Sequence, residues 1–392
     1  MATANPAPPR IEDPEALGLD PEKVRALVER ARREVDQGIL PSCQLALARH
    51  GRLAWFETLG SATNESRYVV FSCTKALMAG AVWLLIGEGA LDPSMVVADV
   101  VPEFAANGKE SVTLEQLLTH TAGFPNAPLG PPDWFSREGR LARFARWRLE
   151  FEPGTRFWYH PTSAHWVVAE LIERVTGRDY RAVANERVLD RLGLRQFRLG
   201  VPESDQGDIA ALEVRGEAAT PEELAAALGV PEMPATEVTD EALVGFNDPA
   251  VRALGVPGGG GVTTAADLAI YYQALLHDPG GLWDAEVRRD GTSNVRVTFP
   301  DPFLGMPGNR TLGLVVNGDD GKGHFRGFGR TAGPRAFGHG GAAGQIAWAD
   351  PDSGLSFAYA TNGIDANVLR VARRGVALSS LAAACVPEAG GR

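Results

Sequence analysis

The stretch that decides the fold is "FSCTKALMAG", residues 71–80. Ser72 stands three residues before Lys75, at the point where an apolar helix is predicted to begin, and no other Ser-x-x-Lys occurs in the chain. A helix that starts at Ser72 would bring the two side chains together on one face, one turn apart. Its free N–H groups and positive dipole end would point at the serine oxygen. A desolvated, neutral lysine amine could then take the proton of the hydroxyl, which would make Ser72 a nucleophile.

A purely structural interpretation of the same residues is also open. Ser72 could cap the helix, and Lys75 could be an exposed residue of its first turn. Two features favour the chemical interpretation. The chain has only four lysines, Lys23, Lys75, Lys109 and Lys322, and the residues around Lys75 are apolar.

Composition limits the classes of function. The 392 residues are 44% hydrophobic and 22% charged, which is typical of a soluble globular protein of two or three domains or one bilobal unit. The net charge of −11 argues against nucleic-acid and anionic-membrane partners. Three isolated cysteines, Cys43, Cys73 and Cys385, show no metal-ligand spacing and suit a reducing compartment. We expect no metal, no organic cofactor, no signal peptide and no membrane span, and a cytoplasmic location.

Periodicity predicts the order of elements. A helix over 20–39 precedes a hairpin over 43–60 that turns at His50 and Gly51. Further helices are predicted at 113–119, 162–176, 180–191 and 264–276, three strands over 336–363, and a closing helix over 367–386. We therefore predict a loose N-terminal arm (1–19), an α/β sheet domain built from 20–71 and 285–392, and a mainly helical domain (72–284).

Five segments, in this order, extend the pattern beyond Ser72 and Lys75: 87–104, 112–125 ("VTLEQLLTHTAGFP"), 151–180 ("FEPGTRFWYHP…ERVTGRDY"), 255–276 and 337–362 ("FGHGGAAGQ…"). Together they resemble the serine hydrolases related to class C β-lactamases and penicillin-binding proteins, over nearly the whole chain. The resemblance implies the β-lactamase/transpeptidase-like fold, of α+β class, with an antiparallel sheet flanked by helices and an inserted helical region.

The resemblance also implies roles for individual residues. Ser72 matches the acyl-accepting nucleophile, Lys75 the lysine that shares its proton, and Tyr159 the tyrosine that acts as general base and then protonates the leaving group. His339-Gly340-Gly341 matches a strand motif that normally begins with lysine and pairs with substrate. The N–H groups of Ser72 and Ala342 would form the oxyanion hole.

Two departures from the family pattern point to the substrate. Pro161 stands where the family has an asparagine that holds a substrate amide, and His339, neutral near pH 7, replaces the lysine that attracts a carboxylate. The His-Gly-Gly form resembles the family VIII carboxylesterases, so a small-molecule ester of a short-chain acid is the expected substrate. The candidates for an apolar pocket are Phe124, Trp134, Trp158 and Trp348.

Other functions remain open. An amidohydrolase of the same fold (β-lactamase, D-aminopeptidase or DD-carboxypeptidase), an acyltransferase and a catalytically silent binding module all fit the same residues. The sequence leaves the oligomeric state open. His120 is expected to organise its loop by hydrogen bonds, and the spacing of His160 and His165 disfavours a metal site.

Overall fold

The computed structural model describes residues 10–233 and 237–387. Its main sheet is antiparallel, with six strands in the order β2-β1-β10-β9-β8-β7. The strands are β1 (Ser42–Arg49), β2 (Arg52–Gly60), β7 (Val315–Val316), β8 (Phe337–Gly338), β9 (Ile346–Asp350) and β10 (Leu355–Thr361). The β1–β2 hairpin turns at His50 and Gly51, whose positive φ angles of 54° and 75° suit a tight turn between twisted strands. The predicted hairpin is therefore confirmed.

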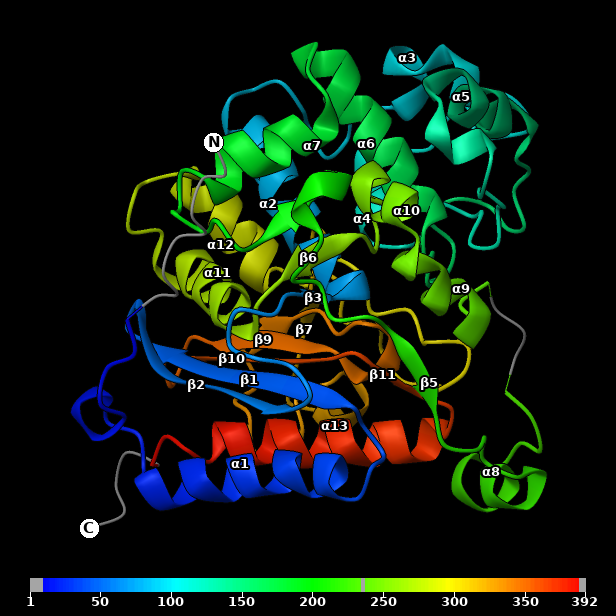
Figure 1. Ribbon diagram of the computed structural model, residues 1–392. Helices are drawn as coiled ribbons and strands as arrows, with labels where there is room; N and C mark the ends of the chain where they lie inside the picture. Colours follow the sequence, from blue (N-terminus) through cyan, green and yellow to red (C-terminus); the bar gives the residue numbers. More distant parts are fainter. Residues whose placement is uncertain (1–9, 234–236, 388–392) are drawn as a thin grey trace.

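Helices cover both faces of this sheet (Figure 1). The first and last helices, α1 (Pro21–Asp36) and α13 (Val368–Ala383), lie side by side on one face. Asp20 caps α1 by accepting hydrogen bonds from the N–H groups of Glu22 and Lys23. Arg374 of α13 pairs with Glu34 of α1, which ties the two helices together. On the other face lies α11 (Ala265–His277), which contacts β1, β9 and β10.

Most of the remaining helices form the upper part of Figure 1, whereas α8 (Pro221–Leu228) lies at its lower right. The others are α2 (Thr74–Gly87), α3 (Val97–Val100), α4 (Leu114–Leu118), α5 (Arg137–Arg146), α6 (Ser163–Thr176), α7 (Tyr180–Ala182), α9 (Asp240–Val244), α10 (Pro249–Leu254) and α12 (Ala285–Ser293). Two small sheets complete the fold: β3 (Tyr68–Val69) with β6 (Gly261–Thr263) and β4 (Arg198–Leu199), and β5 (Glu213–Arg215) with β11 (Gly363–Asp365).

Two helices lie close to the predicted domain boundary at residue 285. Helix α11, from the predicted helical domain, packs directly on the main sheet. Helix α12, from the predicted sheet domain, packs on α2. One continuous core contains the residues of the sheet face that α11 covers together with those of α2. The sheet and the helices around α2 therefore share one hydrophobic interior.

The N-terminal arm is packed where it is described. Residues 1–9 lie outside the described part, but Leu17 and Leu19 are 2% and 3% exposed and join the core beneath the sheet. Ile11 bridges to Leu53 at the edge strand β2. Two leucines therefore anchor the described part of the predicted arm to the core, while most of its other residues are exposed or half-buried.

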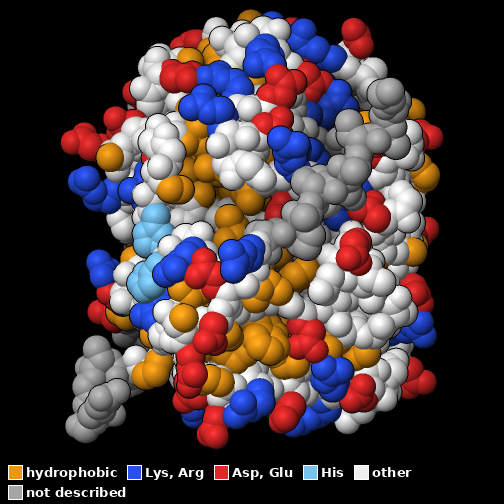
Figure 2. All heavy atoms as spheres, turned by 60° about the vertical axis from the view of Figure 1, so that its left-hand side comes forward, with side chains coloured by type: hydrophobic (Ala, Val, Ile, Leu, Met, Phe, Trp, Pro, Cys, Tyr) orange, Lys and Arg blue, Asp and Glu red, His pale blue; other side chains and the backbone are white. Residues whose placement is uncertain are grey.

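No helix within the described residues has the length and apolar character needed to cross a bilayer. On the face drawn in Figure 2, acidic and basic side chains lie interspersed, with hydrophobic side chains between them.

Candidate active site

Ser72 lies in the turn between a short strand and the start of α2. The strand β3 pairs with β6, and the Val70 N–H donates to the Gly261 carbonyl at 3.0 Å. Phe71 then adopts a positive φ of 42°, a strained conformation for a bulky residue and one that clusters at functional sites. Ser72 occupies a 3₁₀ turn, Phe71–Cys73, and the α-helix begins at Thr74, later than the sequence predicts. The Thr74 hydroxyl holds this turn by donating to the Phe71 carbonyl at 2.5 Å.

Lys75 is fully buried beside Ser72. Its Nζ lies 2.7 Å from each of two carbonyl oxygens, those of Pro161 and Gly258, and 3.0 Å from Ser72 Oγ. A neutral amine has two N–H donors and one lone pair, so two carbonyl acceptors leave the lone pair directed at the serine hydroxyl. Burial lowers the pKa of Lys75, which favours this neutral form.

Tyr159 completes the trio, and its hydroxyl lies 2.9 Å from Ser72 Oγ. The Lys75 Nζ lies 5.1 Å from the centre of the tyrosine ring. Ser72 therefore stands between an amine and a phenol, two groups that can pass a proton. The structure brings together the three residues that the sequence singled out.

Three histidines are buried beside Tyr159, and two of them, His120 and His160, hold its segment by hydrogen bonds. His120 Nδ1 accepts a hydrogen bond from the His160 N–H at 3.2 Å, and the His120 carbonyl accepts from the Trp158 N–H at 3.1 Å. His160 Nε2 accepts from the Phe124 N–H at 3.1 Å. Burial lowers the pKa of His120 and His165 well below the ordinary value, and that of His160 to about 3, so all three are neutral. His120 organises its loop in the way the sequence suggested.

The structure adds a cation, Arg310, that sequence reasoning missed. Its guanidinium carbon lies 5.4 Å from the centre of the Tyr159 ring. Its Nη1 lies 3.3 Å from His339 Nε2, which must accept, so Nδ1 carries the proton and donates to the Gly340 carbonyl at 2.7 Å. Burial and the charge of Arg310 hold the pKa of His339 well below the ordinary value, and His339 is neutral as expected. No sequence signal marks Arg310, because it follows α12 in an irregular stretch, "GNRTLGL".

Gly340 and Gly341 differ in what they contribute. Gly340 is exposed, and a Cβ there would meet only the Gln345 carbonyl, at 3.5 Å, so its backbone is open to an approaching molecule. A Cβ on Gly341 would come within 2.4 Å of the Val70 carbonyl oxygen. Gly341 therefore lets this strand end lie directly against the turn that carries Ser72, and it brings Ala342 to the same cavity mouth as Ser72.

An apolar cavity of about 530 Å³ opens beside Ser72 and Ala342. Of the four predicted pocket aromatics, Trp134 lines it. The structure does not bring Phe124 or Trp348 there. Phe124 is buried against Trp147, and Trp348 lies beneath the sheet, where its indole N–H donates to Ser379 on α13 at 3.2 Å. Trp158 lies next to Tyr159, with its ring 5.6 Å from that of Phe303, outside the cavity lining.

Comparison with known proteins agrees with this architecture. The Beta-lactamase family model matches residues 24–382. The chain belongs to the beta-lactamase family. The fold is the β-lactamase/transpeptidase-like one, and the resemblance stated from the sequence is confirmed. Together, family and geometry make the protein a serine hydrolase of this fold.

Three relatives show the range within the family. Esterase/beta-lactamase LipL of Mycobacterium tuberculosis is 29% identical over 321 residues, which cover 76% of this chain and 70% of LipL. A putative D-alanyl-D-alanine carboxypeptidase of Escherichia coli K12 is 25% identical over 386 residues, covering 89% of this chain and 84% of the relative. A crystal structure of a family VIII carboxylesterase superposes with a TM-score of 0.73 at 26% identity, covering 92% and 97% of the two chains.

Proposed function

We propose that the protein is a serine carboxylesterase that acts through an acyl-enzyme on Ser72. The observation that carries this proposal is the position of Ser72 Oγ, 3.0 Å from Lys75 Nζ and 2.9 Å from the Tyr159 hydroxyl. A neutral Lys75 takes the serine proton as Oγ attacks the ester carbonyl, and the Ser72 and Ala342 N–H groups receive the oxyanion.

The proton then leaves with the alcohol. As the ester C–O bond breaks, Tyr159 donates its proton to the departing alkoxide and is reprotonated from Lys75. Water attacks the acyl-enzyme with the same two groups as base, and the carboxylic acid is released. Ser72 Oγ regains its proton, so neither an oxidant nor a cofactor takes part.

Two features favour an ester over an amide. Pro161 has no side-chain amide that could bind a substrate amide, and its backbone carbonyl already accepts a hydrogen bond from Lys75. The neutral His339 does not supply the positive charge of a lysine. An alkoxide also leaves with less protonation than an amine requires. The esterase names of LipL and of the family VIII structure support the same choice.

Arg310 favours a second candidate, an amidohydrolase that recognises a substrate carboxylate. The cation lies on the Tyr159 side of the site and has no carboxylate within 4 Å among the described residues. The name of the Escherichia coli relative, a putative D-alanyl-D-alanine carboxypeptidase, fits such a substrate.

A hydrolysis panel on wild type and Ser72→Ala tests both candidates. It compares p-nitrophenyl butyrate, nitrocefin and D-alanine p-nitroanilide. Mass spectrometry of the intact protein detects an acyl adduct, and mass spectrometry after digestion locates it on the Ser72 peptide. We expect rapid ester turnover, little amide turnover and loss of activity and adduct in Ser72→Ala. Amide turnover equal to that of the ester would select the amidohydrolase. Ester turnover that survives in Ser72→Ala would exclude Ser72 as the nucleophile.

A further inference from the structure

The two substituents of an ester carbonyl must lie on different sides of Ser72. This placement of the ester rests on the proposed function. Tyr159 hands its proton to the leaving oxygen, so the alcohol part of the ester lies on the Tyr159 side, with Trp158 and Arg310. Once the oxyanion occupies its hole, the acyl chain must take the remaining direction.

The apolar cavity opens in that remaining direction. Its described lining includes Ser72 and Ala342, and Tyr159, His339 and Arg310 are not part of it. The cavity therefore begins at the nucleophile and the oxyanion position and extends away from the group that protonates the alcohol. This placement selects the acyl chain, not the alcohol, as the occupant.

The cavity is much larger than a short acyl chain requires. Its volume of about 530 Å³ is several times that of a buried apolar cavity of about 150 Å³, which holds benzene. Most of the side chains that make its walls are apolar or aromatic, among them Phe71, Leu129, Trp134, Leu243, Phe246 and Val251. An acetyl group would leave most of these walls in contact with water, whereas a longer chain would cover them.

Two acidic residues also line the cavity, Glu237 and Asp248, and they add a second restriction. The Asp248 carboxylate caps α10 by accepting a hydrogen bond from the Ala250 N–H at 2.8 Å. The Glu237 carboxylate accepts a hydrogen bond from the Thr162 hydroxyl at 2.8 Å, and no Lys, Arg or His nitrogen of the described residues lies within 4 Å of it. Burial raises the pKa of Glu237, and the hydrogen bond from Thr162 and the nearby Lys75 offset this only in part. An acyl chain that ends in a carboxylate would be repelled here.

We propose that this cavity is the acyl subsite and that the preferred substrates are esters of neutral, apolar acids of medium length or with an aromatic ring. This extends the expected short-chain esters to longer ones. Each methylene that enters the cavity adds about fourfold to kcat/KM, the equivalent of about 0.8 kcal/mol of burial.

Two isomeric esters, ethyl octanoate and octyl acetate, test the assignment directly. They have the same atoms and the same overall hydrophobicity, and they differ only in which side of the carbonyl carries the long chain. We expect kcat/KM for ethyl octanoate to exceed that for octyl acetate by at least about tenfold, with the monoethyl ester of octanedioic acid well below both. Equal values, or a preference for octyl acetate, would overturn the acyl assignment.

A pair of matched variants locates the effect in the cavity. Ala242→Trp places a large side chain in the cavity wall, and Ala226→Trp makes the same change at another exposed helical alanine that lines no described cavity. We expect the octanoate-to-acetate ratio for p-nitrophenyl esters to fall at least about tenfold in Ala242→Trp and to stay at the wild-type value in Ala226→Trp. Because both esters are measured on the same sample, a variant that is only partly folded loses both activities equally and keeps the same ratio. Trp134→Ala is a second variant, and an unchanged ratio in both cavity variants would overturn the proposal.

The experiment also separates the two proposals. Esters that turn over through Ser72 without dependence on acyl length would leave the esterase assignment intact and remove the acyl subsite. Failure of wild type to hydrolyse any ester would remove both.

Discussion

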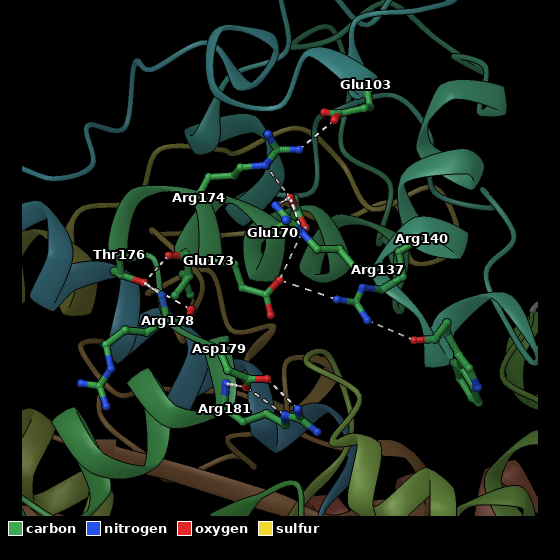
Figure 3. A network of polar contacts seen from close by, with 12 residues as sticks. Glu103, Arg137, Arg140, Glu170, Glu173, Arg174, Thr176, Arg178, Asp179 and Arg181 are labelled. Atoms are coloured by element: carbon green, nitrogen blue, oxygen red, sulfur yellow. Dashed lines mark hydrogen bonds and ion pairs between the residues drawn. The ribbon is translucent and has the colours of Figure 1, made fainter.

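Helix α6 lies between two clusters of charged side chains that differ in how the charges are compensated. Along its second half, three carboxylates meet three guanidinium groups (Figure 3): Glu103, Glu170 and Glu173 with Arg137, Arg140 and Arg174. Before its first turn lies the active site, where Lys75 and Arg310 have no carboxylate within 4 Å among the described residues.

The difference shows which charges serve the fold and which serve the chemistry. A buried carboxylate with two arginines is compensated, and its network also holds the Trp134 carbonyl through Arg140, at 3.3 Å. Burying a basic group without a carboxylate costs stability, whether it stays charged, as Arg310 does, or gives up its proton, as Lys75 does, and such groups persist where a reaction needs them. Substitutions in the paired cluster should therefore lower mainly the stability, and substitutions in the active site should lower mainly the activity.

The largest expected effect comes from Lys75→Met. Without the amine, Ser72 has no base at 3.0 Å, and kcat should fall by about 10⁴-fold or more on p-nitrophenyl butyrate. Lys75 should also make the stability of wild type depend on pH. In the folded protein burial lowers the pKa of Lys75 from its ordinary 10.5, so between the two values the unfolded chain binds one more proton.

The free energy of unfolding of wild type therefore falls as pH drops through that window, and this contribution is absent from Lys75→Met. Urea titrations of both proteins across the window measure it. A constant difference between the two proteins would mean that Lys75 stays charged in the fold. Lys23→Met is the control, because Lys23 is an exposed residue of α1.

A substitution in the paired cluster should lower the stability and leave the activity nearly unchanged. Glu170 is 1% exposed, and Glu170→Gln removes the charge that Arg137 and Arg174 share, at 2.5 and 2.7 Å. We expect the free energy of unfolding to fall by about 3 kcal/mol, with kcat per folded molecule nearly unchanged. Glu213→Gln, which breaks an exposed pair with Arg215, should cost less than about 1 kcal/mol. Equal losses in the two variants would contradict a stabilising role for the buried network.

These contrasts also explain how far the sequence could lead. Ser72 and Lys75 are neighbours because three residues make one helical turn, and such local geometry can be predicted. Arg310 reaches the site from an irregular stretch that no periodicity describes. The prediction that Phe124 and Trp348 line the pocket fails because a sequence alone cannot distinguish a pocket aromatic from a core aromatic. The cavity itself is assembled from residues 128–134 and 237–259, segments that only the tertiary fold brings together.

Arg310→Gln should lower kcat by about 30-fold, because the guanidinium stabilises negative charge on the Tyr159 oxygen while the proton moves. Arg310→Lys should recover much of the loss, since it keeps the charge. Arg296→Gln is the matched control: Arg296 is paired with Glu115 and Asp290 and lies outside the site. Activity of Arg310→Gln within twofold of wild type would show that Arg310 serves packing alone.

The smallest expected effect is a shift in the pH profile, and it identifies how Arg310 acts. The active form of Lys75 is neutral, so kcat/KM should fall tenfold per pH unit below the pKa of this amine. The charge of Arg310 helps to hold that pKa down, after burial itself. Removing the charge in Arg310→Gln should therefore move the acid limb to higher pH, by a fraction of a unit, whereas Arg310→Lys should leave it in place. A variant that loses activity with an unmoved acid limb would show that Arg310 positions Tyr159 and His339 and has no influence on the charge of Lys75.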